Sequence, residues 1–86
     1  MVNQEWDLDA GALYLRLSEG KVARTVEIDD STNVDLDAAG TVLGIEVLNP
    51  GSGWPLIAVL RQFKVSDEDA AELMAGYRHT VSMSVA

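Results

Sequence analysis

Apolar residues recur at every second position through the first half of the chain, as in strands that bury one face. The alternating positions are Leu13, Leu15 and Leu17, then Val26 and Ile28, then Val34 and Leu36, and last Leu43, Ile45 and Val47. Turn-forming residues at 18–21, 29–33 and 37–40 separate these runs. We predict four strands and a fifth edge strand over residues 5–7. The turn at 18–21 predicts a short hairpin that pairs residues 13–17 with residues 25–29.

The period changes after a connector at residues 49–53, which contains one proline and two glycines. Leu56, Val59, Leu60 and Phe63 recur at helical spacing and predict a first helix. Ser66 precedes three acidic residues, and this order is typical of a helix amino terminus. The second predicted helix has an apolar stripe made of Ala70, Leu73, Met74 and Tyr77. Residues 80–85 alternate again, which predicts a last edge strand or a loose tail.

These elements predict an α+β fold: an antiparallel β-meander of four to five strands, followed by two carboxyl-terminal helices that pack on one face of the sheet. The 86 residues are expected to form a single domain. Within it, residues 5–48 form the meander, 49–53 the connector, 54–78 the helical part and 79–86 the edge strand or tail. A domain of this size has a small core, so we expect it to gain buried surface by forming a homo-oligomer, most simply a dimer.

Charge narrows the range of partners. The net charge is −8, and residues 1–48 carry ten acidic and three basic residues. Nucleic-acid binding depends on neutralising phosphates, so an acidic sheet argues against it. A basic protein partner fits better, although solubility alone would also explain the charge. The chain has no cysteine, no long apolar run and no leader pattern, so we expect a cytoplasmic protein without membrane contact.

One spacing points to a metal. Asp35, Asp37, Gly40 and Glu46 occupy the first, third, sixth and twelfth positions of a calcium loop of the EF-hand kind. Ala39, at the fifth position, has no side-chain oxygen, and the flanking residues alternate like strands where an EF-hand requires helices. A metal site made of Asp35, Asp37 and Glu46 is therefore one hypothesis, and a solvated turn between strands is the other. No other cofactor is implied.

Two further groups of residues are candidates for a function. His79, the only histidine, could act as a catalytic base beside a serine or an aspartate, or could simply be a cation near a helix end. No nucleophile with a paired base is evident, which favours a non-enzymatic protein. Tyr14 points away from the predicted core and, together with Val42 and Leu48, could form a second apolar patch. The predicted interface consists of Tyr14, Val42, Leu48, Val81 and Met83.

The chain also resembles a known family. Residues 6–18 (WDLDAGALYLRLS), 26–29 (VEID), 33–37 (NVDLD) and 40–48 (GTVLGIEVL) resemble the prokaryotic family known as domain of unknown function 2283. The resemblance covers residues 5–48 and implies a compact β-meander. It implies no catalytic residues, because the function of the family is unassigned, and many members have an acid where this chain has Ala39.

The sequence thus predicts a small acidic protein-interaction module that is homo-oligomeric. The alternatives are a calcium- or metal-responsive domain built on residues 35–46, and an antitoxin-like protein that neutralises a basic partner.

Overall fold

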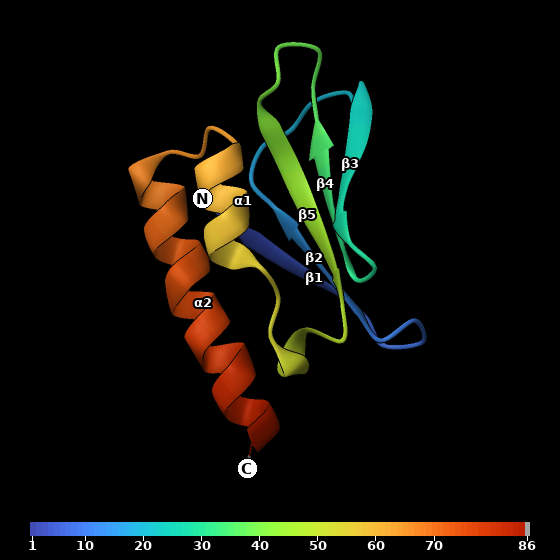
Figure 1. Cartoon of the computed structure of the whole chain (residues 1–86), viewed down its shortest axis with the longest axis vertical. Helices are drawn as coiled ribbons and strands as arrows, with labels where there is room; N and C mark the ends of the chain where they lie inside the picture. The colour runs from blue at the N-terminus through green and yellow to red at the C-terminus, as the bar shows by residue number, and fades with distance from the viewer. Residues whose placement is uncertain (86) are drawn as a thin grey trace.

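The structure has two layers, a five-stranded sheet and a pair of helices that cover one of its faces (Figure 1). This computed structural model describes the backbone of residues 1–85 and the side chains of residues 1–78. The strands are β1 (Asn3–Asp7), β2 (Ala12–Arg16), β3 (Arg24–Asp29), β4 (Thr32–Leu36) and β5 (Val42–Leu48). A short 3-10 turn, η1 (Pro50–Ser52), leads to α1 (Leu56–Gln62) and α2 (Asp67–Val85). The predicted α+β class, with its two carboxyl-terminal helices, is confirmed.

The strand order is β1-β2-β5-β4-β3, with every neighbouring pair antiparallel. The predicted hairpin between residues 13–17 and 25–29 is therefore wrong, because β2 pairs with β1 and β5 and not with β3. β5 is the most buried strand, and the central place gives it a neighbour on both sides. The segment after β2 instead crosses the ends of β5 and β4. There Leu17 and Ser18 donate backbone hydrogen bonds to Leu43, and Ala23 donates one to Leu36.

A change of register near the start of β5 reverses the direction of one predicted surface residue. Asp35 pairs with Gly44, but Leu36 pairs with Val42, so Leu43 is an extra residue opposite β4. Side chains alternate between faces along a strand, and an inserted residue shifts that alternation by one. Val42 consequently points into the core, where it is 2% exposed. The prediction that Val42 contributes to an outer apolar patch is wrong.

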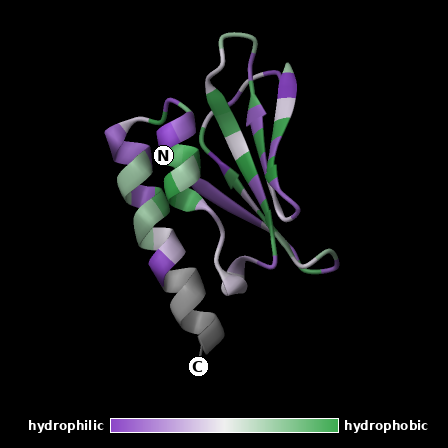
Figure 2. Cartoon of the chain, viewed as in Figure 1, coloured by the Kyte–Doolittle hydropathy of each residue, from purple (hydrophilic) through white to green (hydrophobic). Residues whose placement is uncertain are grey.

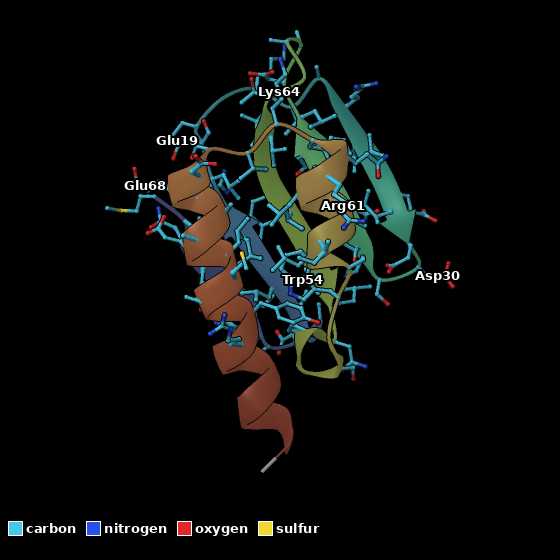
Figure 3. The ribbon with its side chains drawn as sticks, turned by 60° about the vertical axis from the view of Figure 1, so that its left-hand side comes forward. Glu19, Asp30, Trp54, Arg61, Lys64 and Glu68 are labelled. Carbon is cyan, nitrogen blue, oxygen red and sulfur yellow. The ribbon has the colours of Figure 1, made fainter. Side chains whose placement is uncertain are left out.

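The helices bury the apolar face of the sheet. In Figure 3, α2 lies over β1 and β2, and α1 lies over β5 and β4. Their buried contacts with the sheet come from Leu56 and Val59 of α1 and Leu73 of α2. Trp54, just before α1, meets the ring of Tyr77 edge-on at 5.7 Å between ring centres. The core thus lies between the two layers, and the opposite face of the sheet is left to solvent.

α2 begins at the predicted cap and ends later than predicted. Ser66 accepts a hydrogen bond from the Asp69 backbone N–H at 3.1 Å, which confirms the predicted cap. The helix then continues to Val85, so the predicted edge strand or tail over residues 79–86 is wrong for residues 80–85. Val81 and Val85 follow Tyr77 at intervals of four, so they fit a helix as well as a strand, and extending a helix that has already formed avoids a new nucleation step. Among the described residues, no helix has both the length and the apolar character that crossing a membrane requires.

Candidate functional site

The uncovered face of the sheet, called the outer face below, is organised in rows that run across the strands. The register of the strands aligns one row consisting of Glu5, Tyr14, Glu46, Asn33 and Glu27. The next row consists of Asn3, Arg16, Gly44, Asp35 and Thr25. Together these rows carry four carboxylates and a single base, Arg16. The acidic character of the first half of the chain is therefore displayed on this face. In Figure 2, β1 is drawn in the purple of hydrophilic residues.

Tyr14 is the largest side chain in the middle of the outer face. Its ring lies across Gly44 on β5, and its hydroxyl donates a hydrogen bond of 2.9 Å to Asp35 Oδ2 on β4. Thr25 on β3 donates to the other oxygen of Asp35 at 2.6 Å. Burial, reinforced by the bond to Asp35 and its negative charge, raises the pKa of Tyr14 to about 12. Tyr14 therefore remains a neutral hydrogen-bond donor at physiological pH and links β2 to β5 and β4.

Arg16 shows how this face holds a cation. Its guanidinium lies 5.1 Å from the centre of the Tyr14 ring, a distance at which cation–π attraction is effective. Its Nε donates to Glu5 Oε2 at 2.6 Å and its Nη2 donates to Glu5 Oε1 at 3.2 Å. This two-bond arrangement lowers the pKa of Glu5. An arginine side chain is thus already bound on the outer face by one aromatic ring and one carboxylate.

Beside this pair the outer face is hollowed between the β1–β2 hairpin and β5. The hollow is open and has a volume of about 660 Å³. Its apolar lining comes from Leu8, Ala10, Ala12, Tyr14 and Leu48, and its carboxylates are Glu5, Asp7, Asp9 and Glu46. Two of its apolar side chains are exposed, Leu8 at 86% and Leu48 at 39%. Trp6 borders the hollow through its place in β1, but its side chain shares the face of Leu13, its partner on β2. We call this feature the acidic hollow, and it contains no basic residue.

The three carboxylates predicted to bind a metal do not converge. Asp37 lies beyond the end of β4, where its Oδ1 accepts the backbone N–H groups of Ala39 and Thr41, both at 2.9 Å. Asp35 accepts the bonds from Tyr14 and Thr25, and Glu46 accepts one from Asn33 at 3.3 Å. In the part of the chain with described side chains, no three acidic, histidine or cysteine residues gather closely enough to hold a metal ion. Asp37 instead stabilises the β4–β5 turn.

The residues predicted for an interface are divided by the fold. Tyr14 and Leu48 both line the acidic hollow, and Leu48 is 39% exposed. Val42 is in the core, as described above. The side chains of Val81 and Met83, and that of the candidate base His79, lie outside the described residues. The structure therefore brings two of the five predicted residues to one surface.

The predicted set omitted most of the acidic hollow. Trp6, Asp7, Leu8 and Asp9 alternate apolar and acidic residues through the end of β1 and the following turn. That alternation is present in the sequence. The direction of a turn residue such as Leu8 cannot be predicted from it, because alternation assigns a face only to residues within a strand. The missed signal was an apolar leucine between two aspartates.

The chain combines a two-layer α+β fold with an acidic, partly apolar outer sheet face. The model of the family described as "Protein of unknown function (DUF2283)" matches residues 4–49, which is more than half of the chain. The chain therefore belongs to this family, and the expected resemblance is confirmed. The matched segment contains almost all of the sheet, while α1 and α2 lie outside it. Comparison with curated proteins and with solved structures found no match.

Proposed function

We propose that the protein is a protein-interaction module that binds a basic segment of a partner protein in the acidic hollow. The observation that supports this most directly is the pairing of bare apolar side chains with carboxylates in one depression of an uncovered sheet. An apolar lining provides affinity through burial, whereas surrounding charge selects the sign of the partner and speeds its approach.

The partner segment is best matched by lysine or arginine alternating with apolar residues. Lysine and arginine have aliphatic stems that pack on apolar surface while their charged ends reach carboxylates. Leu8 and Leu48 offer apolar surface to such stems, and Asp7 and Glu46 provide carboxylates on opposite sides of the hollow. Arg16, held between Tyr14 and Glu5, is a precedent within the molecule for this mode of binding.

Isothermal titration calorimetry can test the proposal. We would titrate the whole chain with a peptide of alternating lysine and valine, using a glutamate–valine peptide of equal length for comparison. The lysine peptide should bind, and a Leu8→Ser variant, which removes an exposed apolar side chain from the hollow, should bind it more weakly. The glutamate peptide should have no effect.

A matched pair of double variants distinguishes binding in the hollow from a general attraction of the peptide to the acidic protein. Combining Asp7→Asn with Glu46→Gln removes two charges from the hollow and should weaken binding about tenfold. The control combines Glu27→Gln with Asp29→Asn, which removes two charges from the edge strand β3, and should change affinity less than about twofold. Equal losses in the two double variants, or no detectable binding of the lysine peptide, would show that the hollow is not the binding site.

A further inference from the structure

The outer surface of the helical layer differs from the sheet in charge and polarity. Residues 49–86 carry four acidic and three basic residues, so this half of the chain is close to neutral. Between α1 and α2 runs an apolar groove of about 370 Å³, in which Arg78 is the only charged residue. Ile57 on α1 is 52% exposed and Met74 on α2 is 40% exposed. Met74, expected in the buried stripe of α2, thus faces the groove and solvent.

One stripe along α2 borders this groove and has a symmetric arrangement of charge. Asp67, Ala71, Met74 and Arg78 are spaced by four, three and four residues, which places them on one face of the helix. The acid lies at one end, the base at the other, and the small and apolar residues lie between. The two charges are separated by about 16 Å along the axis. Neither forms an ion pair with another residue whose side chain is described.

We infer that this face binds a second copy of the same chain, with the two α2 helices packed antiparallel about a two-fold axis. A two-fold axis between Ala71 and Met74 places Asp67 of each protomer opposite Arg78 of the other, so a single stripe is complementary to itself. Ala71 allows close approach of the helices, and Ile57 and Met74 of both copies form an apolar centre.

Charge favours this occupant over the others. A basic segment is not expected in the groove, because Arg78 lines it and no acid does. Two copies meeting through their outer faces would bring four carboxylates against four, whereas the helical layer carries almost no net charge. The inference does not depend on the acidic hollow, which lies on the opposite side of the sheet and stays open in such a dimer.

Sedimentation velocity of the full chain from about 1 μM to about 300 μM tests the inference. An interface of one helix pair is small, so we expect reversible dimers with a dissociation constant on the order of 10 μM. Met74→Lys should abolish the dimer, because it places two charges at the apolar centre. A chain that remains monomeric over the whole range would overturn the inference.

A charge swap tests the antiparallel geometry itself. Asp67→Arg alone and Arg78→Asp alone should each weaken the dimer about tenfold, because each places like charges together at two symmetric contacts. The variant carrying both changes should regain wild-type affinity within about threefold. Asp30→Arg, in the β3–β4 turn, makes the same charge change as Asp67→Arg far from the interface and is the control.

Circular dichroism and urea unfolding show whether each variant is folded, and Met74→Leu supplies a conservative variant that should still dimerise. Failure of the double variant to recover affinity would disprove the antiparallel stripe. Loss of the dimer in Leu48→Lys, with no loss in Met74→Lys, would place the interface on the outer face and overturn the inference.

Discussion

Gly44 determines where Tyr14 can lie. A Cβ atom at position 44 would occupy the space of the Tyr14 ring and hydroxyl, so only glycine allows the ring to cross β5 and reach Asp35. An aromatic side chain that covers a glycine of a neighbouring strand protects the exposed backbone there. The glycine, the tyrosine and the aspartate therefore act as one unit, although they belong to three strands.

Gly44→Ala should destabilise the protein by about 2 kcal/mol, because the methyl group displaces Tyr14 and breaks its bond to Asp35. Urea unfolding gives this value. In a Tyr14→Ala background the same substitution should cost less than about 0.5 kcal/mol, since the space is then empty. Equal costs in the two backgrounds would mean that Tyr14 does not occupy this position.

The raised pKa of Tyr14 makes stability fall in alkali. Between pH 10, the ordinary value, and about 12, the unfolded chain releases the Tyr14 proton while the folded chain keeps it. The folded state then binds more protons, so the free energy of unfolding decreases as the pH rises through this range. Tyr14→Phe should lack this part of the decrease. The phenolate absorbance of Tyr14 is the difference between a protein that has Tyr14 and the same protein with Tyr14→Phe. In an Asp35→Asn background this difference should appear at lower pH than in the wild type, because burial persists but the carboxylate charge is absent.

Thr32 lowers stability by burying a hydroxyl group without a hydrogen bond in the described part of the chain. Its side chain is fully buried opposite Val47, and its hydroxyl finds no hydrogen-bond partner among the described residues. Thr32→Val keeps the shape and removes the unpaired hydroxyl, so it should leave stability unchanged or raise it by up to about 1 kcal/mol. Thr32→Ala, which leaves a cavity, should be less stable than Thr32→Val by thermal or urea unfolding. A loss of stability in Thr32→Val would show that the hydroxyl has a partner.

At the level of elements, the start of α2 depends on Ser66. The Ser66 hydroxyl satisfies the Asp69 N–H, which has no partner within the helix. Ser66→Ala should lower the free energy of unfolding by about 1 kcal/mol, and Ser66→Thr, which retains the hydroxyl, should restore most of it. Urea unfolding compares the three proteins. If Ser66→Ala were as stable as wild type, the cap would contribute nothing.

The elements themselves could be predicted from the sequence because period-2 and helical patterns record which face each segment buries. Leu13 and Leu15, Val34 and Leu36, and the helical Leu56 and Val59 all face the core as predicted. Strand order could not be predicted in this way. A turn at residues 18–21 indicates a local hairpin. It gives no information about β5, which comes later in the chain and pairs with the edge of β2 that the hairpin would have used.

Two other errors have equally specific causes. Val42 changed face because Leu43 is an extra residue in β5, and a single insertion is invisible in an alternating pattern. The end of α2 was ambiguous because Val81 and Val85 fit both the spacing of a helix and the alternation of a strand. For the acidic hollow, Tyr14 and Leu48 could be assigned to the outer face, whereas Leu8 joins them only through the conformation of the β1–β2 turn.

At the level of the whole molecule, the family segment and the folding unit differ. The matched residues 4–49 form the sheet, but the apolar face of that sheet is buried by α1 and α2. A fragment of residues 1–49 should therefore lack cooperative urea unfolding and should bind a dye specific for exposed apolar surface. Val59→Ala in the full chain should remain folded but lose about 2 kcal/mol. A fragment that unfolds cooperatively would show that the sheet is stable alone.

The central place of β5 also sets the order in which the protein can assemble. The β1–β2 hairpin and the β3–β4 hairpin are each local, but they share no hydrogen-bonded ladder until β5 lies between them. During synthesis the two halves of the sheet must therefore wait for the last strand to leave the ribosome. The contact between β2 and β5 closes the longest loop in the sheet, so the rate of folding should respond most to changes in Ile45 and its neighbours.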